Sequence, residues 1–168
     1  PGGSDVTMLM GSGLQPGTLE VGPASQDFGS RAISSTGSEV SFTLTNTGAA
    51  PTGTITVGIS DTTNYAISSN TCTAALAAAA TCRVGITFGP RSVGAKVATL
   101  SVMATPGGTD TASLTGIGTA TITVTPTGTG TGTVSSNPAG LSCGSTCTAT
   151  FSTPTVTLTA APGSDIFA

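Results

Sequence analysis

The sequence predicts an all-β protein whose main part is an antiparallel β-sandwich, followed by a partial second small β unit. Two observations predict this fold: apolar residues alternate with Thr and Ser over many short runs, and Gly, Pro, Asn and Ser separate those runs. A period of two places one set of side chains in a core and the other in solvent, as in a half-buried strand. Hydrophobic residues make up 37% of the 168 residues, which is enough for a packed core.

The strand-like runs fill residues 18–118. In the third run Val40, Phe42 and Leu44 share one face, and in the sixth Val84 and Ile86 do the same. Seven or eight short strands with frequent turns are typical of an immunoglobulin-like sandwich. In order the runs are "TLEVG", "ASQDFGS", "SEVSFTLTNTG", "TITVGIS", "YAISS", "CRVGITFGP", "AKVATLSVMA" and "DTASLTGIG".

Several segments of this region also carry a resemblance to a known family. They are "QDFGS" (26–30), "FTLTNTG" (42–48), "NTC" (70–72), "TCRVGITFGP" (81–90), "VGAKVATLSV" (93–102) and "SLTGIG" (113–118). In this order they resemble the bacterial choice-of-anchor D repeats, which are immunoglobulin-like sandwiches akin to the ASH and major-sperm-protein-like domains. The resemblance implies one such sandwich over residues 14–118.

The first residues of the chain repeat a later part of it. "PGGSDVTMLMGSG" (1–13) aligns with "PGGTDTASLTGIG" (106–118) at an offset of 105 residues, and Pro, Gly, Gly, Asp, Leu, Gly and Gly coincide. Since this offset equals the length of one sandwich, residues 1–13 are interpreted as the last strand of a preceding repeat, or as an exchanged strand. The sequence therefore predicts a tandem array.

The sequence changes in character after Gly118. Residues 119–168 resemble the start of a short repeat of secreted bacterial surface proteins, carried by "GTGTVSSNPAGLSCGSTCTATF" and "VTLTAAP". A partial β-rich surface repeat is therefore expected there. Its Gly-rich part, "TGTGTGT" (127–133), lacks the Lys of a phosphate loop and predicts a hairpin connection. Before it, Thr121, Thr123 and Thr125 are expected on one strand face.

The cysteines predict disulfides. Cys72 and Cys82 enclose nine residues, fewer than the roughly 12–15 that an isolated helix needs, so "CTAALAAAATC" is expected to be a loop between strands. Spacings of nine and three, without any His, fit poorly to zinc sites. Of the three possible pairings, the local one is favoured, Cys72 with Cys82 and Cys143 with Cys147. Disulfides indicate a compartment outside a reducing cytosol.

Composition excludes several classes of partner. With four Lys or Arg, seven Asp or Glu and a net charge of −3, the chain has no basic patch for nucleic acid. It has no run of about 18 apolar residues, so no membrane insertion is expected in this segment. The N-terminus lacks the features of a signal peptide, and the start at Pro1 is interpreted as that of a processed or excised fragment.

Catalysis, cofactors and metals are not expected. The chain contains no His, which removes Ser-His-Asp and Cys-His arrangements. Calcium near Asp61 and Asn64 is an alternative, but a single Asp in such a sequence more often caps a turn. The carboxylates are scattered singly, at Asp5, Glu20, Asp27, Glu39, Asp61, Asp110 and Asp165.

These observations together predict a non-catalytic, extracellular structural protein of bacteria. It would be a surface stalk or adhesin segment, or a self-assembling filament subunit, with copies of itself or neighbouring immunoglobulin-like domains as partners. The low charge supports self-contact, because strand edges are normally guarded by charges. The alternative is an accessory carbohydrate- or surface-binding module of a larger secreted enzyme. Sugar sites use aromatic platforms, and the chain has no Trp and only Tyr65.

Overall fold

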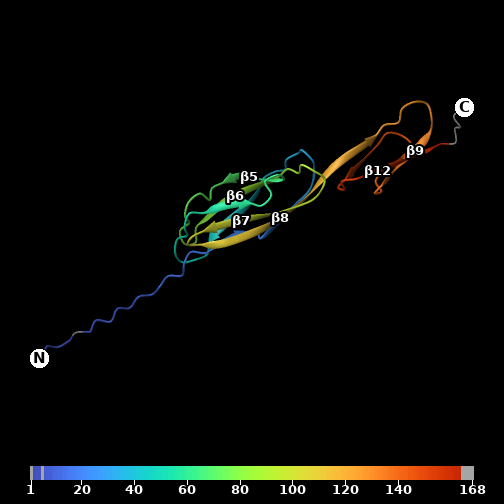
Figure 1. The fold of residues 1–168 in the computed structure, drawn as a ribbon. Coiled ribbons are helices and arrows are strands. Elements are labelled where there is room, and N and C mark those ends of the chain that lie inside the picture. The colour runs from blue at the N-terminus through green and yellow to red at the C-terminus, as the bar shows by residue number, and fades with distance from the viewer. Residues whose placement is uncertain (1, 5, 164–168) are drawn as a thin grey trace.

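The computed structural model describes residues 2–4 and 6–163, and within them it consists of β-strands and loops (Figure 1). The sandwich contains β1 (Leu19–Gly22), β2 (Ser25–Ala32), β3 (Val40–Asn46), β4 (Thr56–Ile59), β5 (Tyr65–Asn70), β6 (Thr81–Phe88), β7 (Gly94–Ala104) and the first part of β8 (Gly108–Val124). The distal unit adds β9 (Gly132–Asn137), β10 (Ser142–Cys143), β11 (Cys147–Phe151) and β12 (Thr157–Pro162). The expected all-β fold is confirmed.

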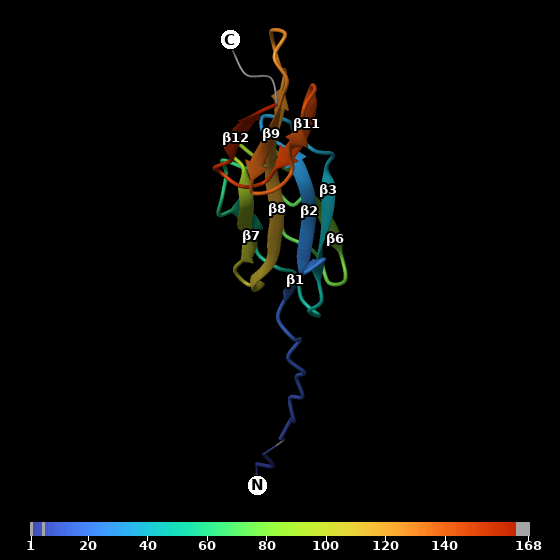
Figure 2. The same ribbon diagram turned by 90° about the vertical axis from the view of Figure 1, so that its right-hand side faces the viewer.

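The strand order identifies the sandwich as immunoglobulin-like. One sheet has the order β1-β3-β6-β5, and the other joins β2, β8, β7 and β4. Neighbouring strands are antiparallel except β2 and β8, which are parallel. In immunoglobulin notation these sheets are A-B-E-D and A′-G-F-C, the arrangement of that fold. Figure 2 shows β7, β8 and β2 side by side.

The core forms where the inward residues of the two sheets meet. Phe42 and Leu44 of β3, together with Val84 and Ile86 of β6, are completely buried, as their alternation predicts. The facing sheet contributes Leu100, Val102 and Leu114, which are equally buried. Fully burying an aliphatic or Phe side chain contributes about 1.5–3 kcal/mol to folding, so this shared layer holds the two sheets together.

A buried Asn closes one end of the sandwich. Asn46, the last residue of β3, is 0% exposed. Its Nδ2 donates hydrogen bonds to the carbonyls of Ala50 (2.8 Å), Leu76 (3.1 Å) and Ala77 (3.1 Å). Its Oδ1 accepts from the backbone N–H groups of Thr18 and Gly48, both at 3.0 Å. One side chain therefore fastens the entry to β1 and two loops to the end of β3.

Strand β8 connects the sandwich with the distal unit. It pairs with β7 from Gly108 to Gly118, and with β2 as far as Thr119. From Ala120 to Val124 it pairs with β11. The boundary expected after Gly118 therefore falls inside a strand. The distal unit buries Leu141 and Phe151, and its second sheet has the order β10-β9-β12.

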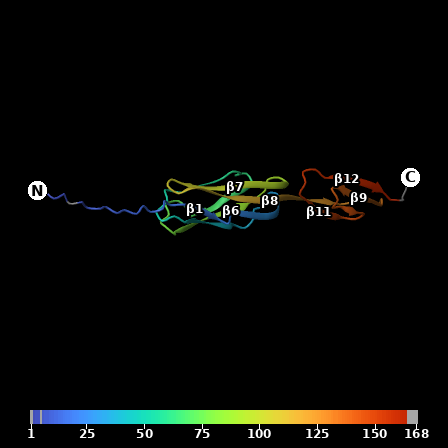
Figure 3. The ribbon, with the colours of Figure 1, turned by 90° about the horizontal axis from the view of Figure 1, so that it is seen from below.

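The N-terminal segment lies apart from the sandwich. Residues 2–4 and 6–18 contain no strand, although Gly17 is buried and Thr18 is bonded to Asn46. The part of the segment before Gly17 extends away from β1 at the end opposite the distal unit (Figure 3). Val6, Met8, Leu9 and Met10 are between 80% and 95% exposed. The interpretation of residues 1–13 as a strand of another sandwich stays a prediction, and Pro1 and Asp5 lie outside the described residues.

Asn46→Asp is expected to destabilise the sandwich by at least about 3 kcal/mol, because an oxygen replaces a donor that serves three carbonyls. The measurement is urea unfolding followed by circular dichroism. Asn137→Asp makes the same chemical change at an exposed position and should cost less than about 0.5 kcal/mol. Equal effects of the two changes would contradict the role given to Asn46.

Candidate interaction surface

The outward residues of β4, β7 and the sandwich part of β8 are all uncharged, and the charged Asp27 of β2, which pairs with Thr115, borders them. Strand pairing aligns these outward residues in rows, with Val97 opposite Thr115, Thr99 opposite Ser113 and so on. Val97 is 67% exposed and Met103 is 51% exposed. We call this surface the uncharged face. It consists of Thr56, Gly58, Ala95, Val97, Thr99, Ser101, Met103, Thr109, Thr111, Ser113, Thr115 and Ile117.

Hydroxyl groups continue along β8 into the distal unit. Thr121 and Thr123 are exposed there, as their alternation predicts, whereas Thr125 follows the end of the strand. The Oγ1 atoms of Thr121 and Thr123 lie 3.1 Å and 3.2 Å from those of Thr150 and Thr148 on β11. Such cross-strand Thr pairs contribute about 0.2–1 kcal/mol each to a sheet. The row therefore stabilises the junction and also presents methyl and hydroxyl groups to solvent.

One hollow lies at the edge of the sandwich and another in the distal unit. An apolar groove of about 460 Å³ lies between the edge strands of the two sheets and is lined by Val57, Ile59, Tyr65 and Ile67, among others. In the distal unit, the Gly-rich segment 126–134 borders a hollow of about 510 Å³. Neither contains a cluster of ionisable groups, so neither resembles a catalytic cleft.

Four of the five described carboxylates, those of Asp27, Glu39, Asp61 and Asp110, make structural hydrogen bonds, and Glu20 is exposed on β1. Asp110 accepts from the backbone N–H of Val21 at 2.7 Å and so ties β1 to β8. Asp27 accepts from the N–H of Gly29 at 2.9 Å, and Glu39 from the hydroxyl of Ser68 at 2.6 Å. The hydrogen bonds from Ser68 and Ser69 hold the pKa of Glu39 below its usual value. Of the expected acidic positions, Asp5 and Asp165 lie outside the described residues.

Asp61 caps a turn. Its carboxylate accepts hydrogen bonds from the N–H groups of Thr63 (2.9 Å) and Asn64 (3.2 Å) and from Asn64 Nδ2 (2.7 Å). Burial acts to raise the pKa of Asp61, but these bonds and the charge of Lys96 outweigh it and lower the pKa overall. Within residues 2–4 and 6–163, no three His, Cys, Asp or Glu side chains come together as metal ligands.

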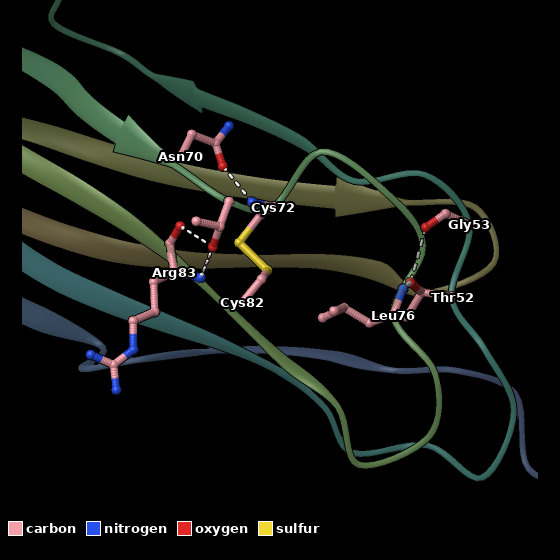
Figure 4. The surroundings of a disulfide bond; sticks show 8 residues. Thr52, Gly53, Asn70, Cys72, Leu76, Cys82 and Arg83 are labelled. Carbon is pink, nitrogen blue, oxygen red and sulfur yellow. Dashed lines mark hydrogen bonds between the residues drawn. A yellow bond between two sulfur atoms is a disulfide. The ribbon is translucent and has the colours of Figure 1, made fainter.

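The first disulfide joins Cys72 to Cys82, with the Cα atoms 5.2 Å apart (Figure 4). It closes the Ala-rich segment, which forms a loop without a helix, as its length predicts. Away from the disulfide, the Leu76 N–H donates to Thr52 Oγ1 at 3.0 Å and the Leu76 carbonyl accepts from the Thr52 N–H at 2.9 Å. The loop is thus fixed at its base and again at Leu76.

The second disulfide joins Cys143 to Cys147, between β10 and β11. The structure therefore has the local pairing that the sequence favours. Two disulfides suit an oxidising compartment. A separate observation concerns membranes: in the part of the chain that the structure describes, no helix is long and apolar enough to cross a bilayer.

The single tyrosine is a core residue. Tyr65 is 1% exposed and packs on Phe88 and Phe28, with ring centroids 4.9 Å and 5.6 Å away. Its hydroxyl donates to the Lys96 carbonyl at 3.1 Å. Burial, followed by the charges of Asp61 and Asp27, raises the pKa of Tyr65 to about 12. Tyr65 therefore offers no platform to a sugar.

Comparisons with known proteins concern the fold alone. No family model and no curated protein matches the sequence. Among solved structures, the chain is similar to PapD-like domain 7 (ASH) of human CEP192, with 20% identity and a TM-score of 0.47 over 70% of this chain and 97% of that one. A protein of unknown function from Porphyromonas gingivalis W83 is 14% identical, with a TM-score of 0.49, over 60% of this chain and 46% of that one.

A third similar structure is the VesB protease of Vibrio cholerae, which is 20% identical with a TM-score of 0.47, over 60% of this chain and 32% of that one. The chain thus spans less than half of the length of these two bacterial structures. Such likenesses carry no argument about activity. The immunoglobulin-like fold follows from the strand order, and the choice-of-anchor D family stays a prediction.

Replacing Cys72 and Cys82 by Ala is expected to destabilise the sandwich by about 2.5–3 kcal/mol, because the unfolded chain regains the entropy of an open loop. Urea unfolding under non-reducing conditions measures this loss. Replacing Cys143 and Cys147 by Ala opens a shorter loop in the distal unit and should leave the unfolding midpoint of the sandwich unchanged. A shift of that midpoint by the second pair alone would contradict this assignment.

Tyr65 is expected to titrate with a midpoint near pH 12 in the folded protein, against about 10 in the unfolded chain. Because the folded-state pKa is raised, the associated stability is complete below pH 10 and is lost as the pH rises towards 12. Ultraviolet absorbance of this only tyrosine measures the midpoint. Asp61→Asn should lower it, and a midpoint near 10 in the folded protein would contradict the described burial.

Proposed function

We propose that this chain is a stiff stalk segment of a non-catalytic, extracellular structural protein of bacteria, built from immunoglobulin-like domains of the choice-of-anchor D type. The observation that carries this proposal is the uninterrupted pairing of β8. On one edge of β8, pairing with β2 ends at Thr119 and pairing with β11 begins at Ala120. The junction between the two units is therefore a paired strand, and a paired strand resists bending more than a loop does.

The positions of the chain ends support a role in spanning distance. The N-terminal segment leaves one end of the sandwich and the distal unit continues from the other (Figure 3). Tension on the ends would run from β1 to β8, which are joined by the bond from Val21 N–H to Asp110. The disulfides suit a stalk outside the cell, where thiols are oxidised.

The uncharged face supports contacts with copies of the same chain or with neighbouring immunoglobulin-like domains. Packing two charged surfaces together desolvates their charges, whereas hydroxyl and methyl groups are buried at much lower cost. Polysaccharide is less favoured as a partner, since the described aromatic rings are buried or half-buried.

Small-angle X-ray scattering tests the stiffness of the junction. The chain should scatter as one elongated particle. Inserting Gly-Ser-Gly-Ser between Thr119 and Ala120 should shorten its maximum dimension and broaden the distance distribution. The same insertion between Gly128 and Thr129, in the loop after β8, should leave the maximum dimension unchanged. If the parent chain already scatters like the first variant, the stalk proposal fails.

A further inference from the structure

The N-terminal segment exposes large apolar side chains to solvent. Four of its large apolar side chains, Val6, Met8, Leu9 and Met10, are at least 80% exposed. An extended segment with this many exposed apolar side chains is unusual in a soluble protein and indicates that a partner buries part of it; in a strand like β8, Leu9 is the side chain that would turn inward. Backbone groups of an extended segment also need partners once it is buried. A partner that is itself a β-sheet would satisfy both requirements.

Residues that 106–118 share with 1–13 have structural roles in β8. Asp110, which aligns with Asp5, accepts hydrogen bonds from the N–H groups of Val21 and Thr111. Leu114, which aligns with Leu9, is completely buried in the core. The coinciding residues therefore include a polar clamp on the first strand and a core side chain.

The coinciding glycines are also required by packing. A Cβ on Gly116 would lie 2.7 Å from the Phe88 ring, and one on Gly118 would meet the Ser92 carbonyl and lie 3.0 Å from Pro90 Cβ. No side chain fits at either position without displacing the neighbouring strand or loop. Gly107, in the turn before β8, and Gly108, the first residue of β8, have positive φ, at 140° and 75°. The glycines at the aligned positions 2, 3, 11 and 13 thus have the pattern of such a strand.

The positions at which residues 1–13 and 106–118 differ are mostly exposed to solvent in β8. Five of the six differing residues in 106–118 point outward, and Ala112 is the buried exception. The outward five are Thr109, Thr111, Ser113, Thr115 and Ile117, all members of the uncharged face. Their counterparts in residues 1–13 are also uncharged, namely Ser4, Val6, Met8, Met10 and Ser12.

We infer that residues 1–13 form the last strand of a second sandwich of this kind, which precedes this one in the same polypeptide. The segment would pair there as β8 pairs here, antiparallel to the counterpart of β7 and parallel to that of β2. Gly11 would lie against an aromatic ring at the counterpart of Phe88. This inference rests on the proposed stalk and deepens it by naming the partner of its N-terminal end.

A second copy of the described sandwich cannot be the acceptor without losing its own strand. Its β8 already occupies the position, with eleven residue pairs to β7 alone. The linker from Leu14 to Thr18 spans at most about 17 Å when fully extended. The preceding sandwich would therefore lie directly at the N-terminal end of this one and would present Val6, Met8 and Met10 on its own uncharged face.

A strand graft tests whether residues 1–13 have the properties of β8. Six substitutions rewrite residues 106–118 of the intact chain as residues 1–13, and a second graft retains Ala112 in case Thr is too large there. The substitutions are Thr109→Ser, Thr111→Val, Ala112→Thr, Ser113→Met, Thr115→Met and Ile117→Ser. At least one graft should melt cooperatively within about 8 °C of the parent.

The matched control writes the same thirteen residues one position later, over residues 107–119, which reverses the inward and outward faces. It should lose cooperative melting. If both grafts lose it as well, the assignment as a last strand is overturned. This result is distinguishable from failure of the stalk proposal, because the scattering of the parent chain does not depend on residues 106–118 being exchangeable.

The size of the intact chain tests which sandwich accepts the segment. Light scattering should find the same oligomeric state with and without residues 1–13, because β8 fills its own place. A concentration-dependent dimer that disappears on deletion of residues 1–13 would show exchange between copies and would overturn the assignment to a preceding sandwich.

Discussion

The pairing of β8 on both edges is the constraint on which the rest of the structure depends. Along one edge it pairs with β7, and along the other with β2 and then with β11. Removing β8 from the sheet would leave backbone N–H and C=O groups without hydrogen-bond partners. Each such group that stays buried costs about 1–3 kcal/mol. The removal of β8 would also uncover Leu114 and take Asp110 away from Val21. The core, the attachment of β1 and the position of the distal unit thus all depend on the same strand.

Only 7% of the residues are charged, and buried polar groups, not ion pairs, determine which arrangement of strands and loops the chain adopts. Exposed ion pairs contribute only about 0–1 kcal/mol, so their scarcity costs little stability. Asn46 and the Thr52–Leu76 bonds fix loops that apolar contacts alone would leave free to slide. Among the described residues, no buried side-chain nitrogen or oxygen lacks a hydrogen-bond partner. A fully satisfied network of this kind specifies one arrangement of the chain ends and loops.

The period of two predicts β3, β6, β7 and the sandwich part of β8, because burial on one face imposes it directly. It does not describe β5, of which Tyr65 alone is buried. Two other arguments place the Ala-rich loop, which is too short for a helix, and the turn at Asp61, where an Asp is expected to cap a turn. The period of two does not predict that β8 runs to Val124, since the alternation continues through Gly118 whether or not the pairing partner changes from β2 to β11. The role of Asn46 is also hidden, because its partners lie up to 31 residues away along the chain. The available signal is an Asn that ends a strand of otherwise alternating apolar residues.

The uncharged face is predictable in composition but not in extent, which depends on strand register.

Low charge does not leave the sheet edges of this sandwich open, contrary to what composition alone suggests. Edge strands β1 and β4 have four residues each, and short edges offer little to pair with. The N–H groups of Leu19 and Val21 in β1 are occupied by Gly107 O and Asp110. Edge strands β2 and β5 shift register, between Asp27 and Ser30 and between Ile67 and Ser69 respectively, and such bulges interrupt further pairing. Any lateral contact between stalks would therefore use the uncharged face. Contacts through the uncharged face join sandwiches that already have all their strands. Residues 1–13 would instead supply the last strand of a preceding sandwich. The two kinds of contact use different surfaces and are compatible in one array.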